Sequence, residues 1–162
     1  YALPALITGG VAFVMMQKFY NSEESKRKFE LLRENQKQAL PIRLQAYERM
    51  VLLLERINPA HLLLRVAPIG KSKDDYATLL THQIQTEFEH NLSQQIYLTA
   101  ETWHVILKAK NSTVQMIRKQ ALRDEVVDAD KMREAIMLEL TEVEAPSAIA
   151  ISFIKEELKR VF

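Results

Sequence analysis

The chain has 162 residues, of which 48% are hydrophobic and 27% charged, and its formal net charge is +1. This composition is that of an ordinary globular domain and excludes wholesale disorder, while the near-neutral charge gives no reason to expect nucleic-acid binding. With 3 Gly, 5 Pro and no Cys, the chain excludes collagen-like and turn-rich β architectures, a disulfide framework and any cysteine-based site.

The first twenty residues predict a transmembrane helix. Lys18 is the only charged residue before Tyr20. A bilayer core of ~30 Å needs about 20 helical residues, so the run is at the lower edge of that length and we expect the natural span to begin before Tyr1. Basic residues at 26–28 follow the apolar run, which argues against a secretory signal peptide and places the rest of the chain in the cytoplasm.

Small residues recur along this segment at spacings of three and four, which places them on one helical face. They are Ala2, Ala5, Gly9 and Ala12. Small residues let helix backbones approach closely in lipid. The pattern predicts a face that docks on another membrane helix, although Gly and Ala are also common in membrane helices generally.

The remainder of the chain predicts an all-α fold. Residues 21–40 form a highly charged stalk helix that we expect to end at Pro41, because proline removes a backbone donor and clashes with the preceding turn. Residues 41–162 then predict a cytoplasmic bundle of about five helices. Helix starts are expected at Pro59 after a break at Asn58-Pro59, after the capping residues Ser72 and Thr99, after Asp128 or Asp130, and at Pro146.

Apolar residues at helical spacing predict the core of this bundle. The first bundle helix is expected to bury Leu40, Leu44, Tyr47, Val51 and Leu54. The next is expected to bury Tyr76, Leu80, Ile84, Phe88, Leu92 and Ile96 before a break near Thr99. Trp103 is either a core anchor, which we favour, or part of a partner interface together with Tyr97.

A polar strip runs beside the second of these apolar stripes. Its members are His82, Glu87, His90, Asn91, Gln94 and Gln95. Side chains of this kind form specific hydrogen-bond networks, so the strip is a candidate partner interface, with plain solvent exposure as the alternative.

Two Glu-x-x-His units, Glu87/His90 and Glu101/His104, resemble the ligand pattern of di-iron bundles, for which Glu55 or Glu139 could add ligands. On one helix the units would lie ~21 Å apart. If the chain turned at Thr99, the units would lie at different heights along the two helices, too far apart to share a pair of metal ions. We therefore assign no metal, cofactor or catalytic residue.

The chain also lacks phosphate-loop, nucleophile-elbow and His-Glu-x-x-His motifs, and we expect it not to be an enzyme.

Charge is segregated in the second half of the chain. Charged residues are all basic from Lys108 to Arg123, and acidic residues dominate from Asp124 to Glu144. The two stretches either attract one another within the bundle or face different partners, anionic lipid headgroups in the case of the basic one.

The stretch Glu87–Tyr97 (EFEHNLSQQIY), with the N-terminal Pro4-Ala5-Leu6 and the charged helix that follows, resembles a family of uncharacterised single-span inner-membrane proteins of the Bacteroidota lineage. The resemblance implies the architecture and an inner-membrane location, and it supplies no activity or ligand.

These features predict a non-catalytic structural or accessory subunit. A single span would anchor it in the inner membrane, and the cytoplasmic bundle would dock on other integral membrane subunits of a larger complex. One alternative is a self-associating stalk, and hence a homo-oligomer. Proline residues at 41, 59 and 68 count against the long helix that a stalk needs. Another alternative is a metal-dependent enzyme that uses the two Glu-x-x-His units.

Overall fold

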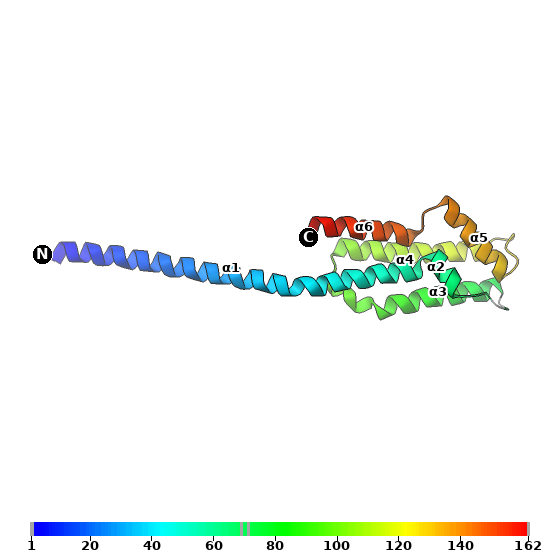
Figure 1. Cartoon of the computed structure of the whole chain (residues 1–162), viewed down its shortest axis with the longest axis horizontal. Helices are drawn as coiled ribbons and strands as arrows, with labels where there is room; N and C mark the ends of the chain where they lie inside the picture. The colour runs from blue at the N-terminus through cyan, green and yellow to red at the C-terminus, as the bar shows by residue number, and fades with distance from the viewer. Residues whose placement is uncertain (1, 69, 71, 162) are drawn as a thin grey trace. The chain divides into compact units, whose positions relative to one another are not determined.

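The computed structural model describes residues 2–68, 70 and 72–161, with the backbone alone at residues 2–12, 14, 36 and 161. No strand occurs among the described residues, which confirms the predicted all-α fold (Figure 1). The helices are α1 (Ala2–Ile57), α2 (Pro59–Arg65), α3 (Lys73–His90), the 3-10 helix η1 (Leu92–Tyr97), α4 (Ala100–Ala121), α5 (Ala129–Glu142) and α6 (Pro146–Val161).

The structure divides into two units, Tyr1–Ile42 and Arg43–Phe162. The first unit is a single helix, the first part of α1, and every side chain described in it is exposed. Within the described residues, no helix is both long enough and apolar enough to cross a membrane. The face predicted from Ala2, Ala5, Gly9 and Ala12 lies outside the described side chains.

The predicted interruption at Pro41 is wrong, because α1 continues through this residue to Ile57. A proline inside a helix removes one hydrogen-bond donor and costs about 3 kcal/mol, but it does not forbid the helix. The charged stretch before Pro41 is rich in Lys, Arg, Glu, Gln and Leu, which all favour helix. The predicted stalk helix and the first bundle helix are therefore the same helix.

The second unit has one hydrophobic core, to which every α-helix of the chain contributes. Helix α4 is its centre and packs against α3, α5 and α6. Fully buried side chains from these four helices include Leu80, Ile84, Ile106, Ile117, Met132, Ile136 and Ile154. The opposite charges of α4 and α5 meet in this packing, since Glu139 accepts hydrogen bonds from Lys119 at 3.3 Å and from Gln120 at 2.5 Å.

The last turns of α1 bury a different face from the predicted one. Tyr47 and Leu54 are buried as expected, but Leu40 and Leu44 are exposed and Val51 is only partly buried. The core residues of this segment are Ala46, Tyr47, Met50, Leu53, Leu54 and Ile57. These residues follow the same helical spacing with a rotated centre, so the periodicity alone did not select the buried face.

The predicted helix starts are confirmed by their capping hydrogen bonds. Ser72 accepts from the amide of Asp75, Thr99 from that of Thr102, and Asp128 from that of Lys131, each through its side chain. These bonds satisfy amide groups that the first turn of a helix leaves without partners.

The predicted break near Thr99 is confirmed, because η1 ends at Tyr97 and α4 begins at Ala100, but the prediction that one helix runs up to this break is wrong. Helix α3 ends at His90, and the 3-10 helix η1 that follows has no buried residue. As a result, Leu92 and Ile96 are exposed instead of continuing the α3 core stripe.

The buried face of α1 makes a direct prediction about stability. Leu54→Ala should lower the free energy of unfolding by about 2–5 kcal/mol, because Leu54 is fully buried. The matched change Leu64→Ala should alter it by less than about 0.5 kcal/mol, because Leu64 is 72% exposed. Urea unfolding followed by the fluorescence of the single Trp measures both; equal losses would contradict the assigned face.

Candidate interaction site

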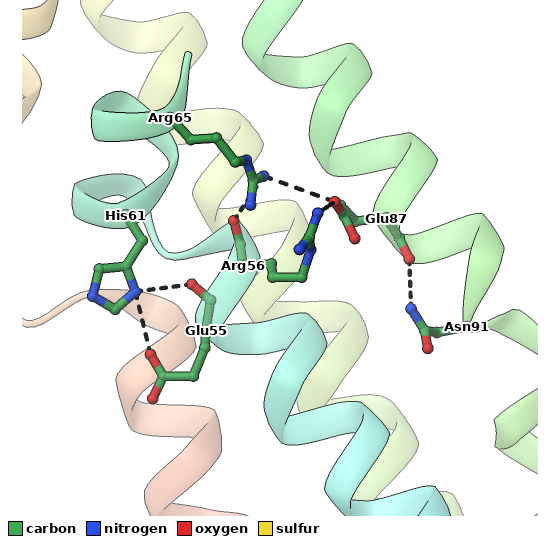
Figure 2. A network of polar contacts seen from close by, with 6 residues as sticks. All are labelled: Glu55, Arg56, His61, Arg65, Glu87 and Asn91. Atoms are coloured by element: carbon green, nitrogen blue, oxygen red, sulfur yellow. Dashed lines mark hydrogen bonds and ion pairs between the residues drawn. The ribbon is translucent and has the colours of Figure 1, made fainter.

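A polar network joins the end of α1, α2 and the end of α3 (Figure 2). Its centre is Glu87, whose side chain is 15% exposed. Arg56 donates from Nη2 to Oε1 of Glu87 at 2.5 Å, and Nη2 of Arg65 lies 3.8 Å from the same oxygen. One carboxylate thus links three helices that are separate in the sequence.

The turn between α1 and α2 creates this arrangement. Asn58 caps α2 by accepting from the amide of Ala60, and Pro59 occupies the first helical position. The chain folds back so that Arg65 donates to the carbonyl oxygen of Arg56 at 3.3 Å. This bond satisfies a carbonyl group that the last turn of α1 would otherwise leave without a partner.

On the other side of α1, Nδ1 of His61 lies 3.0 Å from the carbonyl oxygen of Glu55 and 3.3 Å from its carboxylate (Figure 2). Glu55 and Arg56 therefore make their contacts on opposite sides of the helix.

Electrostatics favour the ionised form of the central carboxylate. The hydrogen bond from Arg56 lowers the pKa of Glu87 below its usual value, and the charges of Arg56, Arg65 and His90 lower it further, against the opposing effect of burial. The same hydrogen bond raises the pKa of Arg56. The contact is therefore a true ion pair at neutral pH.

The structure brings together only part of the predicted polar strip. Glu87 and Asn91 belong to the network, since Nδ2 of Asn91 donates to the carbonyl oxygen of Glu87 at 2.9 Å. Gln94 is half-buried in η1, whereas His82, His90 and Gln95 are exposed. The interface prediction for these residues stays a prediction.

Sequence reasoning missed Arg56 and Arg65, the partners of Glu87. Arg56 precedes Glu87 by 31 residues, and no local pattern links the two. The one available signal was the Asn58-Pro59 helix break, which places an arginine on each side of a tight turn.

Within the described part of the chain, no group of three or more His, Asp or Glu side chains could hold a metal ion. Glu87 is engaged by Arg56, and both Glu101 and His104 are exposed. The additional ligands considered above are also in other contacts, Glu55 with His61 and Glu139 with Lys119. The residues of the metal hypothesis are therefore not assembled into a site.

Trp103 acts as a core anchor. Its ring stacks on that of Phe88, with the ring centroids 5.4 Å apart. Nζ of Lys110 lies over the Phe88 ring, 4.6 Å from its centroid. Trp103 is partly buried against the hydrophobic core, whereas Tyr97 is exposed. The two aromatic residues do not share one role.

A shallow groove lies beside the polar network. Its volume is about 580 Å³, and it is lined by Gln45, Glu48, Arg49, Val51, Leu52, Glu55 and Asn91. Six of these seven residues belong to α1, so the groove follows the face of this helix that the core leaves uncovered. Leu52 is 59% exposed there. The sequence did not reveal this surface, because Val51, which lines it, was expected to be buried.

A family model described as "Family of unknown function (DUF7935)" matches residues 1–161. The chain belongs to this family. No curated protein and no solved structure gives a significant match. For this DUF7935 protein, membership of a family of unknown function confirms the coarse part of the resemblance noted above. The lineage and the membrane location stay predictions.

The central carboxylate predicts a pH-dependent contribution to stability. At pH 7, Glu87→Gln should lower the free energy of unfolding by about 1–2 kcal/mol through loss of the charge-assisted bond. Because folding lowers the pKa of Glu87, its contribution is complete above the ordinary glutamate pKa of about 4.3 and is lost as the pH falls through the lower folded value. The cost of the substitution should therefore shrink below that pH.

The control is Glu89→Gln on the same helix, which replaces an exposed carboxylate bonded to Gln85. Urea unfolding of both variants between pH 7 and pH 3 measures the difference. A Glu87→Gln cost that equals the Glu89→Gln cost, or that does not vary with pH, would contradict the role of the ion pair.

Proposed function

We propose that the chain is a non-catalytic accessory subunit: an N-terminal helix anchors it in the inner membrane, and its cytoplasmic helical bundle docks on a larger membrane complex. The carrying observation is the single helix of the first unit. Within eight positions it exposes five large apolar side chains, each by 59–69%: Phe13, Met15, Met16, Phe19 and Tyr20.

Apolar surface gains about 25 cal/mol for each Å² removed from water, so side chains of this size favour a nonpolar environment strongly. The residues before Phe13 are also uncharged. A lipid bilayer is the environment that suits a helix that is apolar on more than one face.

The end of the apolar segment supports the proposed orientation. Lys18 and Tyr20 stand where the sequence changes from apolar to charged, and both are exposed. Tyrosine and lysine are favoured at membrane–water interfaces, and basic residues close to a span remain on the cytoplasmic side. The bundle that follows would then face the cytoplasm.

The partners would be other integral membrane subunits. The small residues between Ala2 and Ala12 would let a neighbouring helix approach the anchor closely. Exposed members of the polar strip, His82, His90 and Gln95, would be available to a partner of the bundle.

A second candidate function, a self-associating stalk, is supported by the length of α1. This helix has 56 residues and contains Pro41 without ending there, so one of the objections drawn from the sequence no longer holds. The stalk function differs from the first in requiring no other subunit.

The anchor can be tested with a matched pair of substitutions on one helix. Phe13→Lys should move the chain out of the membrane fraction, because a lysine in the apolar segment costs about 2.5–3.5 kcal/mol at the centre of a span. Phe29→Lys is the control, since Phe29 is similarly exposed, at 69% against 65% for Phe13, but lies in the charged stretch. Fractionation of cells after carbonate extraction measures both.

Release of the Phe13→Lys protein with retention of the Phe29→Lys protein is the expected result. Finding the unsubstituted chain in the extracted supernatant, or both variants retained alike, would contradict the anchor.

A further inference from the structure

We propose that a second copy of this chain docks on the outward face of α1, between Leu44 and Arg56, with the two α1 segments parallel and related by a two-fold axis. This inference gives the second candidate function, the self-associating stalk, a specific interface. It does not depend on the membrane anchor, because all the residues that carry it belong to the second unit.

The centre of the face is apolar. Leu52 is 59% exposed and lines the groove. Val51, which is half-buried, lies at the edge of the groove. An exposed leucine between a half-buried valine and charged side chains is the composition of an interface centre with a polar rim.

Two rows of opposite charge flank Leu52. Glu48 and Glu55 are seven residues apart, as are Arg49 and Arg56, so each pair is stacked along the helix about two turns apart. Figure 2 shows Glu55 directed to one side of α1, toward His61, and Arg56 to the other, toward Glu87. The acidic row and the basic row therefore lie on opposite sides of the apolar centre.

The two charged rows are complementary to the same rows on a second copy of the chain when the two α1 segments are parallel. A two-fold axis parallel to the helices places the acidic row of one copy against the basic row of the other, so Glu48 of each copy lies near Arg49 of its mate. An antiparallel pair would place like charges together. A closed two-fold interface uses the same patch on both copies, as this face allows.

Glu48 and Arg49 carry most of the specificity. Neither makes an ion pair with a residue in the described part of the chain, and both are exposed. In contrast, Arg56 is already bound to Glu87, and Glu55 contacts His61. Exposed ion pairs are weak and the face is short, so the dimer should be weak and concentration-dependent.

The absence of Cys from the chain gives a direct test. Leu52→Cys places one thiol beside the proposed axis in each copy, where an oxidant can form a disulfide. The control is Leu138→Cys on α5, whose side chain is similarly exposed at 65%. With the purified full chain in mild detergent, Leu52→Cys should give a covalent dimer and Leu138→Cys should give little.

Charge substitutions in the Leu52→Cys background test the orientation. Glu48→Arg or Arg49→Glu alone would oppose like charges and should lower the initial rate of cross-linking by at least about fivefold. The combined E48R and R49E chain exchanges the two charges at these positions and leaves Glu55 and Arg56 in place. It should restore the rate, which a merely damaged fold would not do.

Cross-linking of Leu52→Cys no faster than that of Leu138→Cys would overturn the inference. Failure of the double exchange to restore the rate would overturn the parallel arrangement. Capture of a different protein at Leu52 in native membranes, without the homodimer, would assign the face to another partner and also overturn it. Because the detergent experiment requires no bilayer, these results are independent of the anchor test.

Discussion

The last turns of α1 bury Tyr47, Met50 and Leu54 in the bundle, and this packing decides which side chains of the same segment lie on its exposed side. With this face inside, Glu55 and Arg56 are directed to its two flanks, where they contact His61 and Glu87. Leu52 is left outside. The positions of the groove, the ion pair and the two charged rows therefore all follow from the packing of this one face of α1.

The sequence predicted those parts of the fold that depend on neighbouring residues. Caps such as Ser72 and Thr99 act within three residues, and proline at 59 opens a helix by its own geometry. The predictions failed where longer-range packing decides. Pro41 did not stop a helix with favourable residues on both sides, and the buried face of α1 depends on helices far along the chain.

The candidate site was predictable to a similar extent. Glu87 and Asn91 were selected from the sequence, and the structure places both in one network. Their partners came from another part of the chain, and a carboxylate that pairs with an arginine 31 residues away leaves no periodic signal. The same contact gives Glu87 a structural role: its carboxylate pairs with Arg56 and joins α3 to α1, so it is not free to bind a metal.

The proposed accessory role rests on the large apolar side chains that the first unit exposes between Phe13 and Tyr20. It is tested most directly by solubilising native membranes in mild detergent, with a tag on the C-terminus, and analysing the captured material by native gel and mass spectrometry. The account predicts a discrete complex with reproducible integral membrane partners. A chain recovered alone would contradict the accessory role. A chain recovered only with copies of itself would contradict it and favour the stalk.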